Sequence, residues 1–132
     1  MLAVNAGLEG KKYPPVSFVA DEERVRAFGL AVLAPEGLGV PPTFVTAAEF
    51  ACFPAVIADP DLELDFSRVV HGEQEYAWER PLRLGETLSA SCRIAAIRSK
   101  GSHGFLTLET TLRDAAGDVV VVGRATLVER GT

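Results

Sequence analysis

The sequence predicts a single α+β domain in which a five-stranded antiparallel sheet wraps around one buried helix. Three observations predict this class. The chain has 132 residues, of which 48% are apolar, and this is enough for one compact core. Apolar residues follow a helical spacing only in the first half, and they alternate with polar residues in the second half. One helical segment is apolar on nearly every side, which is typical of an enclosed helix.

The chain is expected to begin with an edge strand and a surface helix. We expect residues 1–12 to form a loose N-terminus. Residues 13–20 (YPPVSFVA) are β-branched and aromatic and include two adjacent prolines, which is typical of an edge strand. Asp21 precedes two acidic residues and a run of apolar residues at helical spacing. Asp21 should therefore be the N-cap of an amphipathic helix over 22–34.

A second helix is expected over 44–53, with Thr43 as its N-cap. Because the segment is apolar on nearly every side, a sheet should enclose it, and Pro54 should end it. Glu49 is the exception in this helix. A carboxylate on a buried helix must be paired or have a raised pKa. Glu49 is therefore a candidate functional carboxyl, with an ion pair or a solvent-facing position as the alternatives.

Four strands are expected in the second half, over 68–80, 87–98, 104–113 and 119–129, separated by turn sequences. The alternation in the first of these strands predicts two faces: a buried one with Val70, Gln74, Tyr76 and Trp78, and a polar one with His71, Glu73, Glu75 and Glu79. The last strand carries valines on both faces. We therefore expect it to be covered on both sides, by the helix and by a partner chain.

Charge and cysteine content exclude several classes of function. The formal charge of −5, without any basic run, argues against nucleic acid or an anionic membrane as the main partner. Cys52 and Cys92 are far apart and only two histidines accompany them, so we expect no metal site and no cofactor. Free core thiols and an N-terminus that lacks the residue order of a secretory signal predict a cytoplasmic protein.

The predicted element order is that of the hot-dog architecture. The segment HGEQEYAWERPLRLGETLSASCRI, followed by TLETTLRDAAGDVVVVGRATLV, resembles the MaoC-type hot-dog dehydratases, especially their N-terminal, FAS1-dehydratase-like half. The resemblance covers about residues 13–129. Five features carry it: His71 with Gln74, the Arg80-Pro81-Leu82 corner, Gly85-Glu86-Thr87-Leu88, the turn from Asp114 to Asp118, and Pro41-Pro42-Thr43-Phe44. It implies acyl thioesters of coenzyme A or acyl carrier protein as ligands, and addition or removal of water at the 2,3 carbons in fatty acid metabolism.

The sequence departs from this family at the catalytic loop. Catalytic members carry an Asp and a His in a D-x-N-P-x-H type loop after the first helix. The equivalent stretch here, LAPEGLGVPPTF, is short and contains no Asp, Asn or His. Hydration needs a general base for the water and a general acid for the α-carbon, and the Asp and His that supply them in catalytic members are absent from this stretch. The resemblance therefore implies the non-catalytic half, in which one hot dog shapes the acyl site and another performs the chemistry.

No residue matches the family dyad, so the remaining catalytic candidates are His71, Glu73 and Glu49. His71 and Glu73 could act as acid and base, or form an ordinary pair on a solvated face. Gln74, on the buried side, must bond a partner such as the backbone. Thr43 and Phe44 could offer a hydroxyl and free N–H groups to a thioester carbonyl, with simple N-capping as the alternative.

Three functions remain open on these residues. The leading one is an acyl-thioester-binding, non-catalytic subunit of a MaoC-like 3-hydroxyacyl dehydratase or enoyl hydratase. The others are a stand-alone hydratase or thioesterase with relocated catalytic groups, and a hot-dog binding protein without an enzymatic partner. An open sheet edge predicts association, either as a homodimer or as a heterodimer with a dyad-bearing subunit. For the chain alone, we expect the homodimer.

Overall fold

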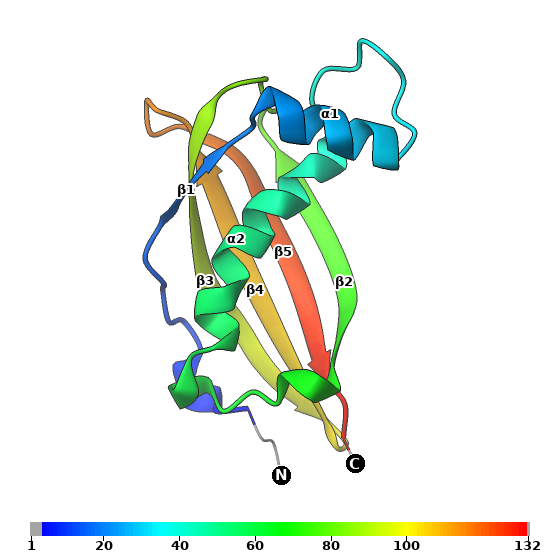
Figure 1. The fold of residues 1–132 in the computed structure, drawn as a ribbon. Coiled ribbons are helices and arrows are strands. Elements are labelled where there is room, and N and C mark those ends of the chain that lie inside the picture. Colours follow the sequence, from blue (N-terminus) through cyan, green and yellow to red (C-terminus); the bar gives the residue numbers. More distant parts are fainter. Residues whose placement is uncertain (1–3, 132) are drawn as a thin grey trace.

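A computed structural model describes residues 4–131 of the chain. It contains two α-helices, α1 (Glu22–Ala31) and α2 (Val45–Ile57), and one five-stranded antiparallel sheet. The strands are β1 (Val16–Val19), β2 (Val69–Trp78), β3 (Thr87–Lys100), β4 (His103–Arg113) and β5 (Val119–Glu129). The helix α2 lies across one face of the curved sheet (Figure 1). The predicted α+β hot-dog class is confirmed. None of the described helices is both long and apolar enough to cross a membrane.

The order of the strands in the sheet is β1-β3-β4-β5-β2, so β1 and β2 are its edges. The last strand, β5, is an inner strand that pairs with β4 on one side and β2 on the other. β5 therefore offers no open edge to a partner chain, while cover of its outer face by a partner stays a prediction, because Val119 and Val122 are only partly buried. Val120 and Val121 are fully buried within the domain, and the long open edge of the sheet is β2.

Residues 4–12, which we expected to be loose, pack against the domain. The backbone N–H of Asn5 donates to the carbonyl of Leu62 (2.8 Å), and that of Gly10 donates to the carbonyl of Ile94 in β3 (2.8 Å). The side chain of Val4 belongs to the buried core. Residues 1–3, the rest of the expected loose segment, lie outside the described residues.

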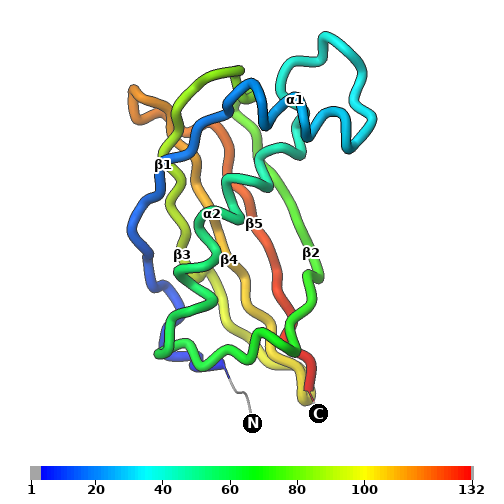
Figure 2. The backbone as a smooth tube through the Cα atoms, viewed as in Figure 1, coloured from blue at the N-terminus to red at the C-terminus, as the bar shows by residue number. Residues whose placement is uncertain are grey.

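The N-terminus of α1 follows the prediction, and its C-terminus does not. The carboxylate of Asp21 accepts a hydrogen bond from the backbone N–H of Arg24 (2.9 Å), as expected of an N-cap. The helix ends at Ala31 instead of residue 34, and Leu33 adopts a left-handed conformation with φ of 56°. The loop that follows projects beyond the end of the sheet (Figure 2).

The helix α2 differs from the prediction at both ends. A 3-10 turn, Pro42–Phe44, precedes it with Pro41 as cap, so Thr43 is not the N-cap. The helix also continues through Pro54 to Ile57. Pro54 lies on the exposed side of the helix, where water can solvate the carbonyl that loses its donor. The sheet covers only one side of α2, and the opposite side stays exposed and apolar: Phe50, Ala51, Pro54 and Ala55.

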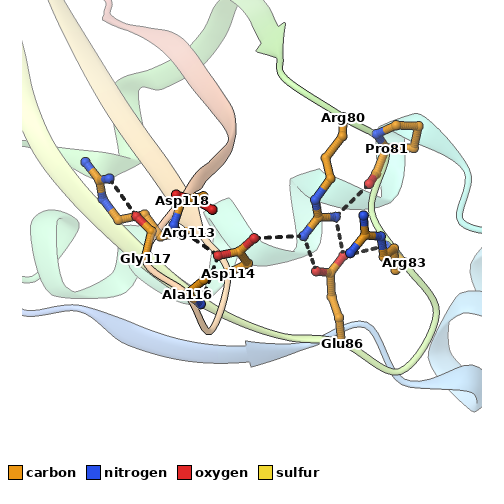
Figure 3. A network of polar contacts seen from close by, with 9 residues as sticks. All are labelled: Arg80, Pro81, Arg83, Glu86, Arg113, Asp114, Ala116, Gly117 and Asp118. Atoms are coloured by element: carbon orange, nitrogen blue, oxygen red, sulfur yellow. Dashed lines mark hydrogen bonds and ion pairs between the residues drawn. The ribbon is translucent and has the colours of Figure 1, made fainter.

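An ionic network fixes the connection that follows β2 (Figure 3). The guanidinium of Arg80 donates to both carboxylate oxygens of Glu86 (2.7 and 3.0 Å) and lies 3.4 Å from a carboxylate oxygen of Asp114. The network joins the β2–β3 connection to the turn between β4 and β5. The predicted Arg-Pro-Leu corner is thus a structural element of the fold that holds the end of β2 in place.

Candidate functional site

A cluster of polar side chains lies between α2 and the edge strand β2. Its centre is Glu49, whose side chain is fully buried on the sheet-facing side of α2. The hydroxyl of Tyr76 donates to Glu49 Oε1, and the amide nitrogen of Gln74 donates to Glu49 Oε2 (2.9 Å). The hydroxyl of Thr46 lies 3.1 Å from that of Tyr76. We call these four residues, Thr46, Glu49, Gln74 and Tyr76, the Glu49 cluster.

A glycine in β5 makes room for the carboxyl of Glu49. Gly123 lies directly opposite Tyr76 in the sheet. A Cβ atom at position 123 would lie 2.7 Å from Glu49 Oε2 and 3.0 Å from the ring of Tyr76. Only glycine therefore allows α2 and its carboxyl to approach the strand so closely.

Burial dominates the electrostatics of the Glu49 cluster. Loss of solvation raises the pKa of Glu49, although the hydrogen bonds from Tyr76 and Gln74 and the charge of His71 act in the opposite direction. Burial, together with the bond to Glu49, also raises the pKa of Tyr76. No ion pair between Glu49 and a lysine or arginine exists within residues 4–131. Glu49 is therefore a carboxyl that can hold a proton at a higher pH than a surface glutamate.

A β-bulge changes which face of β2 carries His71. The register shifts between His71 and Glu73, so His71 lies opposite Leu127 and Gln74 opposite Ala125, both on the helix side of the sheet. Glu73 lies opposite Thr126 on the outer side. The predicted shared face of His71 and Glu73 is wrong, because the extra residue, Gly72, interrupts the alternation. His71 instead shares a face with the Glu49 cluster, and its Nε2 lies 3.0 Å from the carbonyl oxygen of Glu73.

The structure separates the other candidate residues. Thr43 is exposed, and its hydroxyl makes no capping bond. Phe44 is 2% exposed and packs against Phe18 and Phe28, with ring centroids 5.8 and 5.5 Å away. Its N–H is not free, since it donates to the carbonyl of Pro41 (2.9 Å). Gln74 is exposed instead of buried, and it bonds the Glu49 carboxyl and not the backbone, which corrects both the expected burial and the expected partner.

Tyr76, Thr46 and Gly123 are site residues that we did not single out from the sequence. Two signals could have found them. A glycine inside a valine-rich strand indicates a close approach of another group. A buried carboxyl also needs donors, and Tyr76 was already expected on the same face as Gln74.

An apolar cavity of about 350 Å³ lies beside Trp78, near the N-terminal end of α2. The ring centroid of Trp78 lies 6.2 Å from that of Tyr76 in the Glu49 cluster, although no residue of that cluster lines the cavity itself. Its other lining residues are Val40, Pro42, Glu79, Arg80, Pro81 and Leu82. A larger hollow of about 810 Å³ lies on the outer face of the sheet, away from the side chain of Glu49, and has mostly polar walls. The cavity beside Trp78 is therefore the better candidate for an apolar ligand group.

The cysteines and other metal-ligating residues offer no reactive centre in the part of the chain that the structure describes. Cys52 and Cys92 are free and buried, and burial raises the pKa of each thiol to about 11. Both thiols are thus protonated at neutral pH and are poor nucleophiles. No group of three histidine, cysteine or acidic residues is arranged around a metal position between residues 4 and 131.

Comparison with known proteins assigns this chain to a family. Residues 20–122 match the family described as FAS1-like, dehydratase domain region. A UPF0336 protein of Leifsonia xyli subsp. xyli is 33% identical, with 99% of each chain covered. One of Streptomyces coelicolor is 36% identical, covering 98% of this chain and 97% of the relative.

Solved structures share the fold at lower identity. A chain of the HadBC (3R-hydroxyacyl-ACP dehydratase) complex of Mycobacterium tuberculosis matches with a TM-score of 0.76 and 20% identity, over 92% of this chain and 96% of that one. A MaoC-like dehydratase of Phytophthora capsici matches with a TM-score of 0.75 and 15% identity. That match covers 97% of this chain but only 50% of the other, so the fold described here corresponds to half of that protein.

Proposed function

The chain belongs to the FAS1-like dehydratase family of MaoC-like hot-dog proteins, and from this premise we propose that it binds an acyl thioester as the non-catalytic half of a two-chain 3-hydroxyacyl dehydratase or enoyl hydratase. The observation that carries the proposal is the loop between α1 and α2. It contains neither the Asp nor the His of the catalytic members, and its one carboxylate, Glu36, is exposed. The acid and base must then come from another chain.

The arrangement of the Glu49 cluster supports the same proposal. Both carboxylate oxygens of Glu49 accept hydrogen bonds from side chains of the same protein, and the missing side chain of Gly123 leaves room for the carboxyl against β5. His71 shares its face with the Glu49 carboxyl, but its printed hydrogen-bond contact is with the backbone carbonyl of Glu73 (3.0 Å) and not with a carboxylate. The Glu49 cluster is therefore better suited to fixing the shape of a binding site than to transferring a proton to or from a substrate.

Two of the proteins that share this fold support a half-site. One similar chain belongs to a complex of dehydratase subunits, and another similar protein is about twice as long as this chain. In our proposal, the acyl group occupies the apolar cavity beside Trp78. The exposed Thr43, next to Pro42 of the cavity wall, is then a contact for the polar thioester end, and Gln74 is a contact on the β2 side.

Fluorescence of Trp78, the only tryptophan in the chain, provides a direct test of ligand binding. We expect a medium-chain acyl-CoA to change the emission saturably and free CoA to change it much less, because the acyl group lies beside the indole. Pro42→Phe, which narrows the cavity, should weaken this binding several-fold. Leu38→Phe, an exposed apolar position that does not line this cavity, is the matched control. Absence of saturable binding by any acyl-CoA would refute the proposal.

A stand-alone hydratase or thioesterase is the second candidate function, because the buried carboxyl of Glu49, with its raised pKa, bonds Tyr76, whose ring lies next to that of Trp78 in the cavity wall. In that case, the purified chain alone turns over a trans-2-enoyl or acyl thioester. Glu49→Gln or His71→Ala would then abolish turnover, while Glu73→Gln on the outer face would preserve it. A chain that binds thioesters, has no activity and gains none with any dyad-bearing partner is a binding protein, the third possibility.

A further inference from the structure

The hollow of about 810 Å³ on the outer face of the sheet lies beside two β-bulges. One bulge is at Gly72 in β2, and the other is at Ala95 in β3. The two bulges flank one row of directly opposed residues that crosses the sheet: Glu73, Thr126, Thr107 and Ala96. A bulge bends its strand, so the sheet is bent at both ends of this row. All four residues of the row line the cavity, which we call the outer hollow.

The floor of the outer hollow carries no charge. Thr107 in β4 lies opposite Thr126 in β5, and the next outward-facing pair along these strands is Phe105 with Val128. All four side chains are partly buried and line the hollow. The threonine hydroxyls can donate and accept hydrogen bonds, while the phenyl ring and the valine offer apolar contact. Such a floor suits an uncharged chain of polar and small apolar groups, as in a peptide backbone.

The walls of the outer hollow carry charges of opposite sign. Glu73 lies on the side of β2, and Arg98 and Lys100 lie on the side of β3, and all three are exposed. Among the described residues 4–131, none of these three side chains forms an ion pair. Glu75 and Arg124, which also line the hollow, already contact each other (3.6 Å). The hollow therefore has one unpaired anion on one wall and two unpaired cations on the other.

The two walls are too far apart to neutralise each other. Two strands, β5 and β4, lie between β2 and β3, so the walls are three strand spacings apart, which is about 14 Å. A peptide of about four extended residues covers the same distance. An elongated molecule with opposite charges at its ends can therefore contact both walls at once. A simple anion would approach Arg98 and Lys100 but would leave the carboxylate of Glu73 without a partner.

We propose that the outer hollow is a binding site for a linear peptide of about four residues that is cationic at one end and anionic at the other. The cationic end contacts Glu73, the anionic end contacts Arg98 and Lys100, and the peptide backbone lies over Thr107 and Thr126. A free oligopeptide and an exposed segment of another protein share this chemistry. The site lies on the face of the sheet away from α2, so it is separate from the proposed thioester site.

A titration with tetra-alanine, followed by NMR of the isotope-labelled chain, tests the proposal. This peptide has a free amine at one end, a free carboxylate at the other and only methyl side chains. We expect saturable shifts of the backbone N–H signals of Thr107 and Thr126, and no shifts in α2. Each exposed charge contact changes an affinity by about two- to fivefold. Tetra-alanine with both ends capped should therefore bind about tenfold more weakly, and added salt should reduce the difference.

Two substitutions identify which wall contacts which end of the peptide. Glu73→Gln should remove the preference for a free amine over an acetylated one and preserve the preference for a free carboxylate. Arg98→Gln should reduce the preference for a free carboxylate over an amidated one and preserve the preference for a free amine. Arg113→Gln is the matched control and should change neither preference, because Arg113 is an exposed cation on the same face that does not line the hollow. Circular dichroism melts establish that every variant is folded.

A second peptide, capped at both ends and carrying a lysine first and a glutamate last, distinguishes the two sources of the ligand. Tighter binding of tetra-alanine indicates a free oligopeptide, and tighter binding of the capped lysine–glutamate peptide indicates a segment of a protein chain. Three results would overturn the proposal: no saturable shift with either peptide at millimolar concentration, shifts confined to the α2 side of the sheet, or equal affinity for capped, uncharged tetra-alanine.

Discussion

At Gly123, the absence of a side chain is what allows a carboxyl to be buried beside β5. Gly123→Ala should destabilise the protein by about 1–3 kcal/mol, because the new methyl group would lie 2.7 Å from Glu49 Oε2 and force the helix or the carboxyl to move. Urea denaturation measures the change. Gly29→Ala in α1 is the matched control, since its Cβ would meet no atom closer than 3.9 Å. The control should be neutral or stabilising, as expected for alanine in a helix. Equal effects of the two substitutions would contradict this account of Gly123.

The carboxyl of Glu49 should make stability depend on pH in a predictable direction. Because burial raises its pKa above the usual 4.5, the folded state holds the proton more tightly than the unfolded state. This contribution to the free energy of unfolding is fully present below the pKa that Glu49 has in the unfolded state. It is lost as pH rises through the pKa that Glu49 has in the folded state. We therefore expect the stability of Glu49→Gln relative to wild type to increase as pH rises from 4.5 towards neutrality. The difference between the two denaturation curves isolates Glu49, and a difference that does not vary with pH would show that its pKa is not raised.

At the scale of elements, the sequence was sufficient for the class, the strand order along the chain and the Asp21 cap, because each depends on local periodicity. The sequence was insufficient where a single residue changes how two elements distant in the chain face or contact each other. The bulge at Gly72 moved His71 to the helix side of the sheet and left Glu73 on the outer side. Pro54 did not end α2, because it lies on the side that the sheet does not cover. Glu49 and Gln74 were both singled out, but their contact joins two elements 25 positions apart, which no local pattern indicates.

The network around Arg80 gives a prediction about the connection between β2 and β3. Arg80→Met should cost about 1.5 kcal/mol of stability, because it removes a two-point hydrogen bond to the largely buried carboxylate of Glu86. Arg26→Met is the control. Arg26 pairs with Glu22 on the exposed surface of α1, and its loss should cost less than about 0.5 kcal/mol. Thermal or urea denaturation measures the loss of stability in both variants. A loss in Arg80→Met no larger than in Arg26→Met would mean that the network does not stabilise the fold.

At the scale of the whole molecule, two surfaces stay uncovered within residues 4–131. One is the edge of β2, and the other is the apolar side of α2 around Phe50, whose side chain is 56% exposed. A strand edge and an adjoining apolar face are features of an association surface. Light scattering on a mixture of this chain with a dyad-bearing MaoC-like chain should therefore report a mass well above the 14.1 kDa of a single chain. A mixture that stays monomeric at micromolar concentration would show that these surfaces do not pair.

The most direct test of the central claim is hydration of a trans-2-enoyl thioester, followed by loss of the absorbance of its conjugated double bond. The assay compares the purified chain, a dyad-bearing MaoC-like chain from the same organism, and their mixture. We predict no turnover by the purified chain, since its loop between α1 and α2 lacks the Asp and the His of the catalytic members. We predict turnover by the mixture that exceeds that of the dyad-bearing chain alone. Turnover at ordinary enzyme rates by the purified chain would contradict the account.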